Sequence, residues 1–259
     1  MYGIVLSRRD FREADQVITI LTAEEGKREY IARGVKKIVS KNTSHLEPAT
    51  LISFGIAEGK KEFSYLTNVQ PVESFFHLRQ SLPTLHIIGY SLDALFTMLK
   101  EGEADSDIYQ LYISYLRFLN TQEQVRLLLL DAFLIKLFSH LGYHPSLDAC
   151  VVCEKTYKEI GLEFLSATEQ KPGFYFAGGG IICASCKAEK QRIGEVAYPC
   201  GIKEINTLRF LLASSWQDVV SFPLDEEEYR LVHKLIYEFM LYHSERKWDD
   251  WGKISLIMT

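Results

Sequence analysis

Two pairs of cysteines have the spacing Cys-x-x-Cys, which places two sulfurs on one tight turn. They are Cys150 with Cys153 and Cys183 with Cys186, and residues 154–182 between them are long enough for a ribbon of short strands. A tetrahedral zinc ion takes four thiolates at a fixed distance, so two such turns complete its coordination shell. We therefore predict one Zn²⁺ per chain. Because no position remains open for water or substrate, this zinc is expected to be structural and to stabilise a small module.

Other uses of these cysteines stay open at this point: two redox dithiols, a pair of disulfides, or a degenerate site that has lost its metal. A thioredoxin-like dithiol needs a strand before it and a helix after it, which the local sequence does not offer twice. The fifth cysteine, Cys200, is expected to be a lone, partly buried thiol rather than a further ligand. Cysteines at metal spacing fit a reducing cytosol, and the sequence has neither a signal-peptide pattern nor a long apolar run. We expect a cytoplasmic protein without membrane contact.

No arrangement of residues predicts catalysis. The seven histidines are scattered, and the nucleophile, Walker-lysine and zinc-protease motifs are absent. His140 and His144 are four residues apart, but Gly142 is expected to break a helix between them. The triple glycine 178–180 lacks the Lys-Ser/Thr of a phosphate loop and is expected to form a turn before the second cysteine pair. We predict that the protein is not an enzyme.

Charge is distributed unevenly along the chain. The 259 residues carry a net charge of −5, with an ordinary 47 % of apolar and 24 % of charged residues. Residues 1–80 hold twelve Lys and Arg against ten Asp and Glu, which gives +2, and the remaining residues give −7. The N-terminal segment is therefore the part best suited to a polyanion.

Residues 30–46 form a basic stretch with no acidic residue. It contains Arg33, Lys36, Lys37 and Lys41, and its glycine and serines indicate a loop. Such a loop could follow a phosphate backbone without reading bases, because phosphate contacts depend on charge. The alternative is a solvated lysine-rich loop. Three further cations could extend the patch: Arg8, Arg9 and Arg12. Acidic residues lie among these arginines in the sequence.

The apolar pattern divides the chain into strands followed by helices. Five short runs of alternating or β-branched residues predict strands, with a tight hairpin at 58–61, and together they match an OB-fold barrel; an SH3-like barrel would give a similar pattern. After residue 72 the apolar period becomes helical. The predicted strands are 2–7, 16–21, 28–33, 50–57 and 62–69, and the predicted helices are 83–99, 107–119, 122–141, 203–214 and 224–243.

The predicted fold class is therefore α+β with several domains. An N-terminal OB-fold barrel is expected at 1–75, and a helical domain at 76–147 and 191–259. A four-cysteine zinc module at 148–190 is inserted into that helical domain, with residues 163–176 as its expected ribbon. The helix 122–141 is apolar around most of its circumference and is expected to be buried centrally.

This layout and a series of local motifs resemble the bacterial recombination mediator family RecO, over nearly the whole chain. The least typical part is 247–257, with its two tryptophans. The motifs that carry the resemblance are Gly3-Ile-Val-Leu6, Arg8-Arg-Asp10, Glu13-Ala-Asp15, Leu21-Thr22, Gly26-Lys27, Ala32-Arg-Gly34, Lys36-Lys37, Leu46-Glu-Pro48, Leu141-Gly-Tyr143 with Pro145 ahead of the first cysteine pair, and Gly178-Gly-Gly180 ahead of the second.

The resemblance implies a non-catalytic DNA-repair protein of the bacterial cytoplasm, associated with the nucleoid. Such proteins bind single- and double-stranded DNA, anneal complementary strands, and join RecR to load RecA onto gaps coated by the single-strand-binding protein SSB. The family's DNA residues correspond best to the basic loop. The acidic SSB tail needs cations beside an apolar groove, for which Arg126 and Lys136 are candidates; they could equally be solvent-facing ends of their helix.

Two competing hypotheses remain. In the first, the protein is an interaction scaffold whose DNA contact is incidental. In the second, it is an enzyme whose site is too dispersed along the sequence to recognise.

Overall fold

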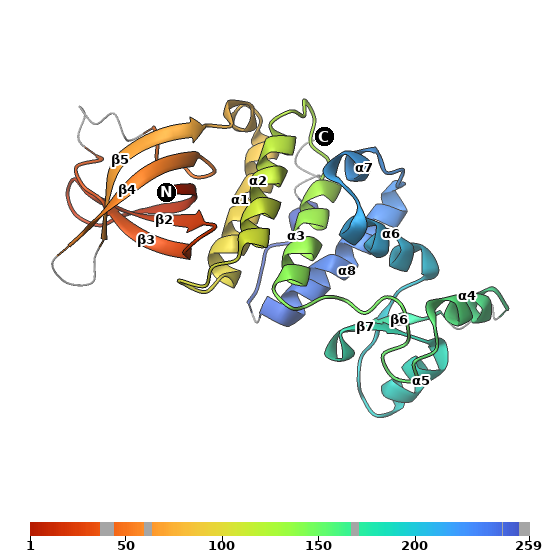
Figure 1. Cartoon of the computed structure of the whole chain (residues 1–259). Coiled ribbons are helices and arrows are strands. Elements are labelled where there is room, and N and C mark those ends of the chain that lie inside the picture. The colour runs from red at the N-terminus through yellow and green to blue at the C-terminus, as the bar shows by residue number, and fades with distance from the viewer. Residues whose placement is uncertain (37–43, 60–63, 167–170, 245, 254–259) are drawn as a thin grey trace. The chain divides into compact units, whose positions relative to one another are not determined.

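The computed structural model describes residues 1–36, 44–59, 64–166, 171–244 and 246–253, and it divides into two compact units at 125/126. Each unit is described separately below (Figure 1). Among the described residues, no helix combines the length and the apolar character that a membrane crossing requires.

The first unit is built on a closed five-stranded barrel. Its strands follow the order β1-β2-β3-β5-β4, and β4 pairs with β1 to close the barrel. This is the strand order of an OB-fold, so the predicted fold class is confirmed. Inward-facing apolar side chains such as Val5, Ile18 and Ile52 are buried and form the barrel core. The strands are β1 (Tyr2–Asp10), β2 (Gln16–Thr22), β3 (Gly26–Ala32), β4 (Leu51–Glu58) and β5 (Ser64–Glu73).

One 3₁₀ helix and two α-helices continue the first unit. A short 3₁₀ helix η1 (Phe76–Arg79) leads into α1 (Leu82–Met98), which has the expected proline, Pro83, in its first turn. The next helix, α2 (Ser106–Leu119), begins at an N-cap, where the Asp105 carboxylate accepts hydrogen bonds from two backbone N–H groups. Ser91 of α1 and Tyr112 of α2 are hydrogen bonded, and the helices run side by side (Figure 1).

The loop between α1 and α2 is attached to the barrel at the start of β3. The Gly102 N–H donates to the Lys27 carbonyl at 2.9 Å. Gly26 has a φ of +66°, and a Cβ there would lie 2.0 Å from the Glu103 carbonyl oxygen. Both facts require glycine at this position, because only glycine combines a positive φ with so close a backbone approach.

The second unit packs its helices around one apolar helix, α3 (Leu128–His140). Every residue of α3 from Leu128 to Ile135 is buried, which confirms the prediction of a central helix. Gly142, just after its end, has a φ of +92°. The surrounding helices are α6 (Ile202–Ala213), α7 (Trp216–Ser221) and α8 (Glu226–Ser244).

The cysteine module lies between α3 and α6 in the sequence and is small. It contains α4 (Tyr157–Ser166), β6 (Gly173–Tyr175), η2 (Phe176–Gly178), β7 (Gly180–Ile182), α5 (Ala184–Arg192) and β8 (Tyr198–Pro199). The sheet order is β7-β6-β8. The triple glycine forms the predicted turn, with Gly179 at a φ of +70°.

Two element predictions were wrong. The predicted ribbon 163–176 begins as the last part of α4, and of its described residues only 173–175 form a strand. A capping pair at Thr156 and Glu159 starts this helix, because each side chain bonds to the other residue's backbone N–H. The helix predicted at 122–141 begins at Leu128, since Arg126 is held by carbonyls outside it. Residues 60–61 of the predicted hairpin lie outside the described residues.

Candidate metal centre and nucleic-acid interface

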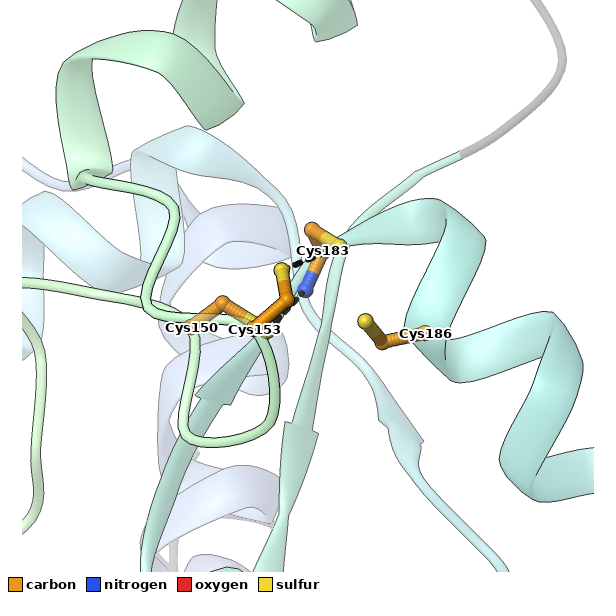
Figure 2. Close-up of side chains that lie close together, drawn as sticks. All are labelled: Cys150, Cys153, Cys183 and Cys186. Carbon is orange, nitrogen blue, oxygen red and sulfur yellow. Dashed lines mark hydrogen bonds between the residues drawn. The ribbon is translucent and has the colours of Figure 1, made fainter.

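The two cysteine pairs meet in one cluster (Figure 2). The sulfur atoms of Cys150, Cys153, Cys183 and Cys186 all lie within 4.8 Å of one another. The sulfurs of Cys153 and Cys183 are 3.7 Å apart. Two sulfurs bound to one tetrahedral zinc ion at about 2.3 Å would be roughly 3.8 Å apart, so the spacing fits a metal ion. The cluster could therefore hold one.

Backbone geometry brings the two pairs together. The first pair lies on a turn in which the Cys150 N–H donates to the Lys155 carbonyl at 2.8 Å, and Glu154 has a φ of +61°. The second pair lies at the start of α5, with Cys183 as its N-cap residue. The Cys183 N–H donates to the Cys150 sulfur at 3.4 Å and joins the two turns. Three of the sulfurs belong to buried residues, and Cys153 is exposed.

The electrostatics of the cluster also suit a cation. Burial opposes ionisation of the Cys183 thiol, but hydrogen bonds from the Ser185 hydroxyl and the Cys186 N–H lower its pKa to about 7. Burial raises the pKa of Cys186, and the neighbouring sulfurs raise it further. Four thiolates in so small a volume repel one another unless a positive ion lies among them. Cys200 is outside the cluster and buried, with a thiol pKa raised by burial.

The predicted DNA-binding cations lie on the barrel, and three of them form ion pairs. Arg8 contacts Glu47 at 2.7 Å, and Arg9 contacts Glu29 at 2.8 Å. Lys36 contacts Asp10 at 2.7 Å. This last pair places the beginning of the basic loop beside the end of β1, as the proposed continuous patch requires. The pairs also reduce the positive charge of the patch.

Two other predicted cations contact aromatic rings. The Arg33 guanidinium carbon lies 3.8 Å from the centroid of the Tyr65 ring, and that of Arg12 lies 4.9 Å from the Phe11 ring. Both arginines are exposed. Lys37 and Lys41 lie outside the described residues.

The two predicted partner-binding cations form internal contacts of the second unit. The Arg126 guanidinium donates to the carbonyls of Val220 and Phe222 at 2.7 and 2.8 Å. The Lys136 ammonium donates to the carbonyls of Leu212 and Ser214 at 2.8 and 3.0 Å. These carbonyls lie at the C-terminal ends of α7 and α6, where cations complete the helices. Both cations are half-buried, so neither is a freely solvated helix end.

Sequence reasoning missed a buried polar cluster that joins α3, α8 and the segment after α8. His233 donates through its two ring nitrogens to Asp131 and Asp250, both at 2.9 Å. The indole N–H of Trp251 also donates to Asp131, at 3.0 Å. Trp251 is fully buried. The available signal was Asp131 itself, because a carboxylate inside an apolar helix requires partners.

Models of one protein family match nearly all of the chain. The model described as Recombination protein O N terminal matches residues 1–75, which contain the barrel, and Recombination protein O C terminal matches residues 79–250. The chain belongs to the RecO family. The RecO resemblance inferred from the sequence is thereby confirmed.

Curated RecO relatives are similar along most of their length. A protein of Symbiobacterium thermophilum is 29 % identical over 247 residues, covering 95 % of this chain and 92 % of the relative. One of Desulforamulus reducens is 28 % identical, covering 95 % and 89 %, and one of Geobacter sulfurreducens is 27 % identical, covering 85 % and 83 %. All three are named DNA repair protein RecO. The RecO assignment therefore applies to the whole chain and not to one domain.

Proposed function

We propose that this protein is a non-catalytic recombination mediator that binds single- and double-stranded DNA and anneals complementary strands. The observation that carries the proposal is the closed barrel with OB-fold strand order in the segment that matches the N-terminal RecO model. OB-fold barrels commonly bind single-stranded nucleic acid through their loops and one face.

The ion pairs of the barrel are compatible with this proposal. Arg9 and Lys36 pair with carboxylates at the surface, and exposed ion pairs contribute only about 0–1 kcal/mol each. A phosphate can therefore replace Glu29 or Asp10 as partner at small cost. The proposed DNA surface comprises Arg8, Arg9, Arg12, Arg33, Lys36, Lys37 and Lys41.

We further propose that the second unit binds proteins. The partners are RecR and the acidic C-terminal tail of SSB, and through them RecA is loaded onto SSB-coated gaps. Arg126 has guanidinium N–H groups beyond those that bond to Val220 and Phe222, and these can serve an acidic tail. The Lys136 ammonium has one N–H beyond the two that bond to Leu212 and Ser214, and it can serve the tail in the same way. The metal ion in the cysteine cluster is proposed to be Zn²⁺ with a structural role, because four thiolates fill its coordination shell.

DNA binding can be tested by charge reversal on the barrel. Arg33→Glu and Lys36→Glu are each expected to weaken binding to any DNA sequence and to reduce the slope of log K against log salt by about 1. Gel shifts across salt concentrations and strand-annealing rates measure both effects. Lys203→Glu, on the second unit, is the charge-matched control and is expected to leave binding unchanged. An unchanged affinity and salt slope in both barrel variants would contradict this DNA surface.

The runner-up function is a protein-interaction scaffold with incidental DNA contact. The ion pairs of Arg8, Arg9 and Lys36 favour it, because they lower the free positive charge of the barrel. It predicts weak DNA binding at moderate salt together with tight retention of SSB or RecR in pull-downs. Nuclease and nucleotide-hydrolysis assays test the absence of catalysis that we propose.

A further inference from the structure

An open cavity of about 480 Å³ lies on the barrel where β3 ends and β5 begins. Two strands meet there in parallel through the pair of Ile31 and Tyr65, and β4 flanks β5 through the pair of Ala57 and Tyr65. The cavity is lined by Arg33, Ala57, Glu58, Gly59, Tyr65, Leu66 and Thr67. Its volume can accommodate a nucleobase with its sugar.

The alternation of β5 places an aromatic ring at this cavity. Leu66 packs against the barrel core, so Tyr65 and Thr67, its neighbours along the strand, point away from the core. The cross-strand neighbour of Tyr65 is Ala57, whose methyl group leaves the space beside the ring open. Tyr65 is half-buried, and an aromatic ring that lines an open cavity on an OB-fold barrel is suited to base stacking.

Arg33 already covers one face of that ring. Its guanidinium carbon is 3.8 Å from the ring centroid, which is a stacking distance. Arg33 differs in this respect from Arg8, Arg9 and Lys36, whose charged groups contact carboxylates. A guanidinium is planar, so the side of it that faces away from the tyrosine ring can take another flat group. Arg33 is an exposed residue, which leaves that face accessible to a ligand.

We propose that the Arg33 guanidinium, positioned by Tyr65, stacks on one unstacked nucleobase of a single DNA strand. This inference rests on the proposed DNA-binding function and specifies which strand form the site prefers. Bases in a duplex are paired and stacked, and only a single strand offers a free base face. The acidic Glu58 at the rim would repel phosphates, so the backbone would pass on the side of Arg33.

The test compares two single strands of about 16 nucleotides, one with bases and one abasic, which carry the same phosphates. Fluorescence anisotropy with the full-length protein is expected to show about tenfold tighter binding of the strand with bases. Arg33→Lys keeps the positive charge but removes the planar guanidinium. It should therefore reduce the ratio of the two affinities, with bases over abasic, to near one. Tyr65→Leu should do the same, whereas Tyr65→Phe keeps the ring and should preserve the ratio. Arg28→Lys, on β3 before Arg33, is the matched control and should not change the ratio.

The outcomes separate this inference from the function on which it rests. Equal binding of both strands by the unmodified protein, or an unchanged ratio in Arg33→Lys, would overturn base stacking and leave DNA binding intact. Binding of neither strand would overturn both proposals. Arg33 is exposed, so its variant tests the inference even if Tyr65→Leu fails to fold. A 2-aminopurine in the strand should be quenched by the unmodified protein and not by Arg33→Lys.

Discussion

At the scale of single residues, the charge state of His233 decides how the end of the second unit is held. Burial by itself would lower the pKa of this histidine, but the carboxylates of Asp131 and Asp250 outweigh burial and raise it to about 9. As an imidazolium, the ring donates a hydrogen bond from both nitrogens, one to each carboxylate. His233 thereby connects α3 and α8 with the segment that carries Trp251.

We predict that the stabilisation due to His233 depends on pH. The folded state holds the proton more tightly than the unfolded chain, whose histidine pKa is 6.5. The contribution is therefore complete below about pH 6.5 and is lost as pH rises through about 9, and it amounts to something on the order of 3 kcal/mol. Urea unfolding of the unmodified protein and of His233→Gln should show a difference in free energy that shrinks across this range.

A second variant controls for packing. His140 is exposed and outside the cluster, so His140→Gln should leave the free energy of unfolding almost unchanged at every pH. A deficit in His233→Gln that stays constant from about pH 6 to about pH 9 would show that the ring acts through its shape and not through its charge.

At the scale of elements, two half-buried cations determine how the helices of the second unit end. Lys136 of α3 donates to carbonyls at the end of α6, and Arg126, just before α3, donates to carbonyls at the end of α7. The last carbonyls of a helix have no partner within it, and their dipoles favour a positive charge. Burial lowers the pKa of Lys136, so its two carbonyl hydrogen bonds offset a desolvation cost.

Replacement of Lys136 by methionine tests this capping role. Lys136→Met keeps most of the aliphatic stem but leaves the carbonyls of Leu212 and Ser214 without their donor. We expect a loss of about 1–3 kcal/mol in the free energy of unfolding, because hydrogen bonds to charged groups have this magnitude. Thermal or urea unfolding measures it. Lys203→Met, at an exposed position of α6, is the matched control; an equal effect in both variants would argue against the cap.

The sequence predicted elements well where local pattern determines them. Five strands and four of the five helices lie close to the predicted ranges, because β-branched runs and helical apolar periods are local signals. The start of α3 was misplaced because Arg126 is bound by carbonyls from residues 220–222, a contact that no local pattern reveals. The start of α4 had a local signal, Thr156 and Glu159, that was overlooked.

The sequence predicts the metal-binding cysteines but not the contacts of the surface residues. The four cysteines could be found from spacing alone, because two tight turns fix their sulfurs. The ion pairs on the barrel join residues on different elements, such as Arg9 and Glu29, and their register is a property of the folded barrel. The partners of Trp251 could not be predicted either, since Asp131 lies 120 residues earlier.

At the scale of the whole molecule, proposed DNA binding and the metal cluster belong to different compact units. The barrel lies in residues 1–125, and all four cysteines lie in residues 126–259. A structural zinc site contributes roughly 10–16 kcal/mol of apparent binding free energy, which is comparable with the total stability of a domain. Its loss should therefore affect the cysteine module far more than the barrel.

We predict that removal of the metal destabilises the cysteine module and leaves DNA binding by the barrel almost unchanged. Cys183→Ser should lose the single equivalent of zinc that elemental analysis is expected to find in the unmodified protein. Amide hydrogen exchange should then rise in residues 146–200 and stay unchanged in the strands of the barrel, with DNA affinity within about twofold of the original. Cys200→Ala changes a buried cysteine outside the cluster and should retain the metal. A metal-free chain with unaltered exchange in the module would contradict the structural role of the metal. A loss of DNA affinity well beyond twofold in Cys183→Ser would mean that DNA binding by the barrel depends on the metal.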